Sequence, residues 1–277
     1  MRRIVGLALL LALAACERPP GPHARPEEIA ALQRARLPAR EAGPAAGIAL
    51  SYLSAGDPAG RRIIFVHGTP GDARGWADFL RACPPGAYCI AVDRPGFGET
   101  TPLQPVASLQ VQADAIAPLL TVMQGQRAVL VGHSLGAPIV AQLALDHPDR
   151  VGGLLLLAGA MDPDLERVMW VQRVGALQPI ASIVPRMWRT TNEELLPLQG
   201  ELRALAPQLN RLRLPIAVVH GTEDPLVPYA NVRFDRVMMI NAQLSVDTIE
   251  GQNHFLPWNE TARVQAVLHR LLQEAQG

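Results

Sequence analysis

The stretch that most constrains this chain is a serine between two glycines, Gly132-His133-Ser134-Leu135-Gly136. The four apolar residues before it predict a strand buried on both faces, and residues 137–145 after it predict a helix. A serine raised in a strained strand-to-helix turn leaves no room for Cβ atoms two residues before or after it, and both positions are glycine. The pattern favours Ser134 as a nucleophile over an ordinary turn in which Ser134 caps the helix.

Strand-like and helix-like segments alternate on both sides of this turn. The strand-like runs lie at 47–53, 62–67, 88–92, 151–159, 215–221 and 244–249. This alternation predicts an α/β fold with a mostly parallel, doubly wound sheet. Between residues 161 and 214 the pattern changes to Met, Trp and Leu at helical spacings, interrupted by prolines. We interpret that segment as a small helical cap inserted after the sixth strand.

Three further motifs follow predicted strands. His67-Gly68-Thr69-Pro70-Gly71 begins at the last residue of the strand at 62–67. Asp224 follows the strand at 215–221, and His254 lies in the loop after the last strand. Together with the Ser134 turn, and in this order, the motifs resemble those of serine hydrolases with the α/β-hydrolase fold. The resemblance covers most of residues 47–277.

The resemblance implies a catalytic triad of Ser134, Asp224 and His254. It also implies an oxyanion hole formed by the backbone N–H groups of Thr69 and Leu135. Glu223 is the local rival of Asp224, but Asp224 occupies the motif position.

Other polar residues near these motifs have more ordinary interpretations. His133, His147, His220 and His269 occupy turn, helix and strand positions instead of the loop position of His254. We expect His67 to shape its turn, and we expect Asp93 in Asp93-Arg94-Pro95-Gly96-Phe97-Gly98 to hold its own loop.

The cap supplies candidates for the roof of an acyl pocket. Met169, Trp170, Met187 and Trp188 are large and apolar at helical spacings. Simple packing of the cap onto the core explains each of them as well as a pocket does.

The N-terminus resembles the signal peptide of bacterial lipoproteins. Arg2 and Arg3 precede an apolar run at 4–15 that is too short to span a bilayer. Leu13-Ala14-Ala15-Cys16 resembles a lipobox, which implies cleavage before Cys16 and its lipidation, with an ordinary secretory signal as the alternative. The resemblance implies a lipid-anchored, periplasm-facing protein of the cell envelope. Glu17, where Asp would signal inner-membrane retention, favours the outer membrane.

These patterns divide the chain into five parts. They are a signal peptide at 1–15, a Pro-rich tether at 16–45, a first core segment at 46–160, the cap at 161–214 and a second core segment at 215–277. Cys83 and Cys89 remain after Cys16 is assigned. In an oxidising periplasm they could form a disulfide, and two buried free thiols are the equal alternative.

Composition narrows the choice of partners. The 277 residues are 49% hydrophobic and carry a formal net charge of zero, which gives no reason to expect nucleic acid as a partner. The sequence shows no cluster with metal-ligand spacing and no phosphate-binding loop, so no cofactor is expected. The expected partners are a small acyl substrate and, through the lipid anchor, a membrane.

The reaction class favoured by these motifs is hydrolysis of a carboxylic ester. An amide, a thioester or a carbon–carbon bond is an alternative within the same fold, because fold does not fix function. Aspartate replaces the serine in the dehalogenases and epoxide hydrolases of this fold, so Ser134 argues against both. A non-catalytic envelope binding protein is the alternative from another class.

Overall fold

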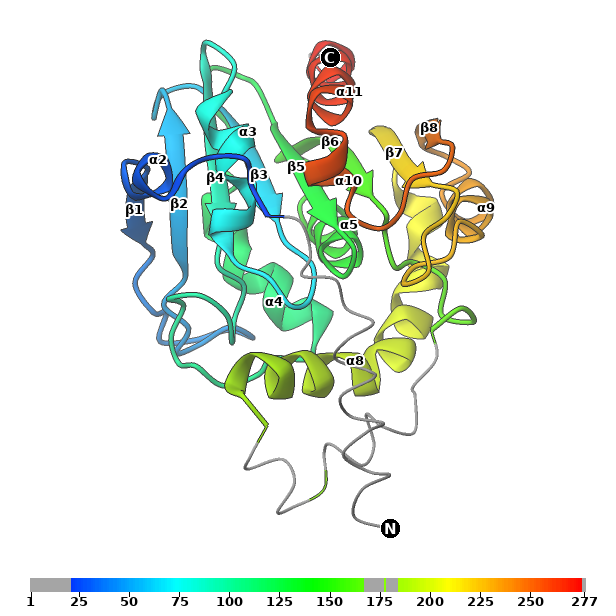
Figure 1. The fold of residues 1–277 in the computed structure, drawn as a ribbon, viewed down its shortest axis with the longest axis horizontal. Helices are drawn as coiled ribbons and strands as arrows, with labels where there is room; N and C mark the ends of the chain where they lie inside the picture. The colour runs from blue at the N-terminus through cyan, green and yellow to red at the C-terminus, as the bar shows by residue number, and fades with distance from the viewer. Residues whose placement is uncertain (1–20, 167–176, 178–183, 276–277) are drawn as a thin grey trace.

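The computed structural model describes residues 21–166, 177 and 184–275. Within these ranges an eight-stranded sheet runs in the order β1-β2-β4-β3-β5-β6-β7-β8 (Figure 1). The strands are β1 (Gln33–Arg36), β2 (Ser51–Gly56), β3 (Arg61–Val66), β4 (Ala87–Val92), β5 (Ala128–His133), β6 (Val151–Leu157), β7 (Pro215–Gly221) and β8 (Gln243–Ile249). Strand β2 pairs antiparallel with β1 and β4, and all other pairs are parallel. The predicted α/β fold with a mostly parallel sheet is confirmed.

Helices cover both faces of the sheet because successive side chains of a strand point to opposite faces. Ile64 and Val66 of β3 belong to one apolar cluster, with side chains of the helices Leu109–Ile116 and Gly136–Asp146. Ile63 and Phe65 belong to a second cluster, with side chains of the helices Ala77–Arg81 and Thr261–Glu274. The helical elements are α2 (Pro26–Ala30), η1 (Ala73–Trp76), α3 (Ala77–Arg81), α4 (Leu109–Ile116), η2 (Ala117–Leu119), α5 (Gly136–Asp146), α8 (Arg186–Leu205), η3 (Ala206–Arg211), α9 (Asn231–Met238), α10 (Leu256–Asn259) and α11 (Thr261–Glu274).

Parallel pairing brings the predicted motifs to one edge of the sheet. Gly68, Ser134, Asp224 and His254 all follow the carboxyl end of a strand, namely β3, β5, β7 and β8 in turn. The carboxyl ends of parallel strands meet at the same edge, which is where ligands of open α/β sheets bind. The fold therefore gathers at one edge residues that are up to 186 positions apart in sequence.

The segment between β6 and β7 contains α8 and η3, in agreement with a helical insertion after the sixth strand. Helix α8 lies below the sheet in the view of Figure 1. Met187 and Trp188, in the first turn of α8, are 47% and 38% exposed, so neither is buried between cap and core. Met169 and Trp170 lie outside the described residues.

The N-terminal segment differs from the extended tether expected over 16–45. Residues 33–36 form β1, which pairs with β2 at the edge of the sheet. The backbone N–H groups of His23 and Ala24 donate to the carboxylate of Asp78, at 2.7 and 2.8 Å. Arg34 bonds the buried carboxylate of Asp93 at 2.7 Å. These long-range partners hold the described part of the segment, from residue 21 onward, against the core, which the prolines alone do not show. The predicted signal peptide and Cys16 lie outside the described residues.

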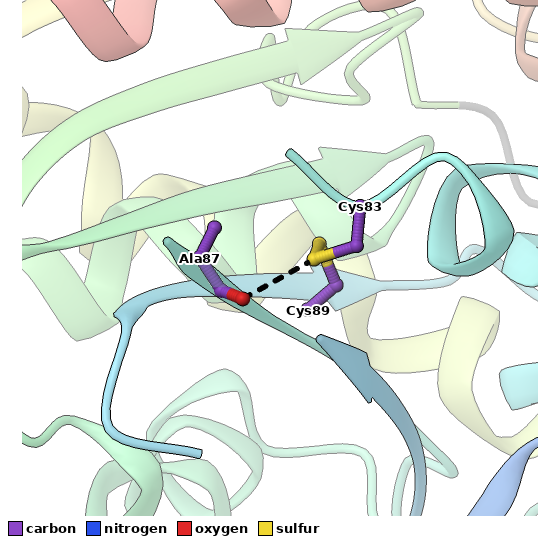
Figure 2. The surroundings of a disulfide bond; sticks show 3 residues. All are labelled: Cys83, Ala87 and Cys89. Atoms are coloured by element: carbon purple, nitrogen blue, oxygen red, sulfur yellow. Dashed lines mark hydrogen bonds between the residues drawn. A yellow bond between two sulfur atoms is a disulfide. The ribbon is translucent and has the colours of Figure 1, made fainter. Parts of the chain in front are cut away.

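Cys83 and Cys89 form a disulfide, with their Cα atoms 5.8 Å apart (Figure 2). The bridge ties the turn after α3 to β4. Ala87 O lies 3.6 Å from Cys83 Sγ, so the bridge packs against the backbone of the turn that it closes. Of the two alternatives, the structure has the disulfide and not two free thiols.

Candidate active site

Ser134 occupies a sharp turn between β5 and α5. Its φ is +55°, and Ser134 as a whole is 9% exposed. A Cβ atom at Gly132 would come within 2.5 Å of Gly136 O, and one at Gly136 within 2.3 Å of Val66 O. Both glycines are therefore required by close backbone approach, as the sequence predicts.

Asp224 and His254 meet directly. His254 Nδ1 lies 2.7 Å from Asp224 Oδ2, and the two residues are 4% and 6% exposed, respectively. Because a carboxylate only accepts hydrogen bonds, His254 Nδ1 is the donor in this bond, and Nε2 is the nitrogen left to exchange a proton. The other carboxylate oxygen of Asp224 accepts the N–H groups of Leu226 and Val227, at 2.9 and 2.8 Å. The acid is thus fixed by its own loop and aimed at the histidine. Glu223, its rival in sequence, is exposed.

His133 connects the serine turn to the histidine loop. Its Nε2 lies 3.0 Å from His254 O, and the two rings are 4.7 Å apart between centroids. Burial and, to a lesser extent, the neighbouring His254 lower the pKa of His133 to about 3. His133 is therefore a neutral donor that holds the backbone of His254. In the described part of the chain Ser134 has no direct hydrogen bond to His254, and such bonds are often long before substrate binds.

His220, in strand β7, contacts the loop that carries Asp224. Its Nε2 donates to Val227 O at 2.9 Å and lies 3.7 Å from Asp224 Oδ2, and burial lowers its pKa. A neutral imidazole beside the carboxylate holds the loop without adding a competing charge.

The loop after β3 lies against Ser134. A Cβ atom at Gly68 would come within 2.7 Å of Ser134 Cβ and 3.3 Å of Ser134 Oγ. The next residue is Thr69, the expected oxyanion donor. Leu135, the other expected donor, precedes the first turn of α5, whose N–H groups have no partner within the helix. Both expected donors are therefore next to Ser134 in the chain or in space.

His67 and Asp93 have the structural roles expected from the sequence. His67 Nδ1 lies 2.7 Å from Gly68 O, within its own turn. Asp93 accepts the N–H groups of Ala73 and Glu99, at 2.8 and 3.1 Å, besides its bond with Arg34.

A buried ion pair beside the Gly68 loop is not evident from the sequence. Arg94 Nη1 lies 2.7 Å from Glu194 Oε1, and the two side chains are 0% and 1% exposed. Gln112 bonds both partners, at 2.6 Å to Arg94 and 3.0 Å to Glu194. The sequence places Arg94 two residues after the buried strand β4, but it gives no sign of the partner, because Glu194 lies 100 residues away on α8.

Two further observations concern metals and membranes. The described His, Cys, Asp and Glu side chains form no group of three or more that could hold a metal ion. No helix in the described ranges combines the length and the hydropathy that a membrane crossing requires.

A model of the Alpha/beta hydrolase family matches residues 63–267, about three quarters of the chain, including all the site residues named above. The chain is 32% identical over 112 residues to the dihydrolipoyllysine-residue acetyltransferase component of the acetoin cleaving system of Cupriavidus necator, covering 40% of this chain and 30% of that protein. It spans 45% of a second curated relative, so it covers less than half the length of both.

Two other proteins match over more of their length. A 2-hydroxy-6-oxononadienedioate/2-hydroxy-6-oxononatrienedioate hydrolase from Burkholderia vietnamiensis is 25% identical over 253 residues, covering 76% of this chain and 86% of that protein. The solved structure of a meta-cleavage product hydrolase from Pseudomonas fluorescens is similar with a TM-score of 0.65 and 20% identity, covering 84% of this chain and 97% of that one. The structural likeness shows that the two chains share a fold.

Proposed function

The chain belongs to the alpha/beta hydrolase family, and we propose that it is a serine hydrolase that cleaves a carboxylic ester through an acyl-enzyme. The observation that carries the proposal is the buried 2.7 Å hydrogen bond between His254 Nδ1 and Asp224 Oδ2, at the same edge of the sheet as Ser134. If the Asp224–His254 pair served only to stabilise the fold, no strained serine turn would be needed at the same edge of the sheet. A histidine held in one tautomer next to such a turn is the arrangement that general-base catalysis requires.

The proposed reaction has two halves. Ser134 Oγ attacks the acyl carbonyl while His254 Nε2 takes its proton, and Asp224 stabilises the imidazolium that forms. His254 then gives the proton to the departing alcohol, which leaves an acyl group on Ser134. In the second half His254 takes a proton from a water, and the water oxygen attacks the acyl carbon. The bond from that carbon to Ser134 Oγ then breaks, and His254 returns the proton to Oγ, which releases the acid and the free serine.

The backbone N–H groups of Thr69 and Leu135 are the proposed oxyanion donors. A donor of this kind contributes about 3–4 kcal/mol because it meets a charge that develops only in the transition state. The closeness of Gly68 to Ser134 and the position of Leu135 at the start of α5 support this assignment.

The test is hydrolysis of p-nitrophenyl esters of increasing acyl length, with Ser134→Ala as the matched control. We expect activity that depends on Ser134 and covalent labelling of Ser134 by a fluorophosphonate. If the unaltered protein hydrolyses none of the esters and takes up no label, the serine-hydrolase proposal is wrong. A binding protein that keeps the fold then becomes the better explanation.

The second candidate reaction is hydrolysis of a carbon–carbon bond. It is favoured by the similarity, over most of both chains, to the hydrolase from Burkholderia vietnamiensis. 2-Hydroxy-6-oxononadienedioate, the compound in that hydrolase's name, assayed beside the ester series, separates the two reactions. An amide and a thioester with the same acyl group complete the panel, because all four share the attack on a carbonyl.

We also propose that Cys16 carries a lipid anchor that holds the protein on the periplasmic side of the cell envelope, with the outer membrane as the favoured site. The lipobox-like Leu13-Ala14-Ala15-Cys16 supports this proposal. The Cys83–Cys89 disulfide supports an oxidising compartment. Expressed in a Gram-negative host, Cys16→Ser should move from the detergent-extracted membrane fraction to the soluble one. Retention of the variant in the membrane would contradict the anchor.

A further inference from the structure

The peptide group between Gly68 and Thr69 joins a carbonyl bonded by Arg94 to the proposed oxyanion donor. The carbonyl of Gly68 and the N–H of Thr69 belong to the same planar unit, and in a trans peptide they point in opposite directions. Whatever fixes the direction of Gly68 C=O therefore also fixes the direction of the Thr69 N–H.

Two donors converge on Gly68 O. Arg94 Nη2 lies 2.9 Å from it, and His67 Nδ1 lies 2.7 Å from it. The backbone N–H of Arg94 donates to His67 Nε2 at 3.1 Å, so Nε2 has no proton and Nδ1 must be the donor to Gly68. The carbonyl is held by one neutral and one cationic donor, on the side away from the Thr69 N–H.

The cationic donor is clamped from the cap. The carboxylate of Glu194 on α8 accepts hydrogen bonds from both terminal nitrogens of Arg94, at 2.7 and 3.1 Å. This bidentate geometry fixes the plane of the guanidinium. Gln112 of α4 bonds both side chains, and the ring of Phe97 lies 4.9 Å from the guanidinium carbon. Arg94 therefore has one orientation available, with Nη2 aimed at Gly68.

A second contact joins the cap to the same loop. Thr69 Oγ1 donates to Thr191 Oγ1 of α8 at 3.2 Å. Thr191 and Glu194 are about one helical turn apart, so one short stretch of α8 contacts both Thr69 and Arg94, the side chain that bonds Gly68 O.

We propose that Arg94, held by Glu194 of the cap, is a positioning residue that aims the Thr69 N–H at the oxyanion and strengthens it as a donor. The strengthening follows because a cation that bonds a carbonyl polarises the whole peptide group, and hydrogen bonds in a chain reinforce one another. The inference rests on the proposed function, since an oxyanion forms only if Ser134 attacks a carbonyl.

The competing explanation is an ion pair that serves only folding. Buried ion pairs are weak stabilisers relative to apolar side chains of similar size, because desolvation of both charges opposes their attraction. A pair with a purely structural role should therefore be replaceable by two apolar side chains without loss of catalysis in the folded protein. A positioning pair should not.

The experiment compares the double variant Arg94→Met/Glu194→Met with Arg61→Met. Arg61 is a matched control, because it is also a buried arginine and it donates to the carbonyls of Arg127, Leu272 and Ala275 at the opposite end of β3. Each protein is titrated with a fluorophosphonate to count active sites. Then kcat and KM for a p-nitrophenyl ester and the affinity for a trifluoromethyl ketone, which mimics the tetrahedral oxyanion, are measured.

For the double variant we expect kcat per active site to fall about 10- to 100-fold with KM changed little, because the donor is misdirected and not removed. The affinity for the trifluoromethyl ketone should fall by a similar factor. Arg61→Met should lower the melting temperature and leave kcat per active site unchanged. An unchanged kcat and an unchanged ketone affinity in the double variant overturn the proposal.

Two further results keep the test decisive. If the double variant does not fold, Glu194→Gln, which preserves size and removes the charge of the clamp, should lower kcat severalfold, and an unchanged kcat overturns the proposal. If the unaltered protein has no Ser134-dependent activity, the proposed function fails and this inference fails with it. Activity in the unaltered protein together with full activity in the variants defeats the inference alone.

Discussion

The two sides of Ser134 are built in opposite ways. On the acid–histidine side, formed by Asp224 and His254, the proposed working groups are side chains, and the backbone holds them: two N–H groups fix Asp224, and the carbonyl of His254 bonds His133. On the oxyanion side, formed by Gly68 and Thr69, the proposed working group is the backbone N–H of Thr69. Here the side chains of Arg94 and His67 hold the backbone, through their bonds to Gly68 O.

This difference decides how each side can fail. A side chain can be removed by one substitution, so the acid–histidine side should lose its function abruptly. A backbone N–H cannot be removed by substitution and can only be displaced, so the oxyanion side should lose function by degrees. We therefore expect substitutions on the acid–histidine side to have the largest effect on kcat, those on the oxyanion side a smaller one, and those elsewhere in the fold none.

Asp224→Asn tests the acid–histidine side. An amide can donate to His254 Nδ1, which favours the wrong tautomer, so we expect kcat for an ester substrate to fall about 10⁴-fold. Glu223→Gln is the matched control, because it makes the same change at the adjacent, exposed carboxylate and should leave kcat unchanged. Near-normal turnover of folded Asp224→Asn would remove Asp224 from the triad.

Gly68→Ala tests the oxyanion side by displacement. The new Cβ would come within 2.7 Å of Ser134 Cβ and 3.2 Å of His133 O, so the loop and the serine turn must separate. We expect kcat to fall about 100-fold or more, as for loss of an oxyanion donor. Gly200→Ala, on the exposed side of α8 where a Cβ meets nothing within 4 Å, should leave kcat unchanged. Equal activity of the two variants would show that Gly68 is not packed against the serine as described.

Acidification tests the part of the oxyanion side held by His67. Burial and, secondarily, the Arg94 charge lower the pKa of His67 from 6.5 to about 3. Between these values the unfolded chain binds a proton at His67 and the folded protein does not. The free energy of unfolding should therefore fall as pH decreases through this range, by up to about 1.4 kcal/mol per pH unit from this histidine.

The measurement for His67 is chemical denaturation of the unaltered protein and of His67→Gln at several pH values between about 4 and about 6. The variant should show the shallower dependence, whatever its absolute stability. Parallel curves for the two proteins would mean that His67 is not held neutral in the folded state.

Loss of the disulfide should affect neither side of the site. Cys83→Ala/Cys89→Ala opens a small loop between α3 and β4, and loop-closure entropy predicts a loss of about 2 kcal/mol in the free energy of unfolding. Because the carboxyl edge of the sheet is not involved, kcat for an ester should stay unchanged. Melting curves with and without reductant check the first expectation, and a parallel drop in kcat would show that the bridge also supports the site.

Local sequence patterns predicted much of the fold and of the candidate site. The strand at 215–221 and the helix after the Ser134 turn were predicted within a residue or two, because each is bounded by its own glycine, proline or apolar period. The pairing of Asp224 with His254 was also predictable, since each follows a strand and parallel strands end at one edge. The edge strand β1 was missed, because its four residues carry no apolar alternation and are held by pairing with β2.

What the sequence by itself determined is therefore the set of groups that follow each strand: Ser134, Asp224, His254 and the Gly68–Thr69 peptide. Each is marked by glycines or by its position after an apolar run, which are local properties. What only the tertiary structure decided is which distant residues hold those groups in place. Glu194 reaches Arg94, and Arg94 reaches Gly68, across gaps of 100 and 26 residues. Such contacts depend on how a cap helix packs on a finished sheet, and the desolvation that makes them strong does not exist until the chain has folded.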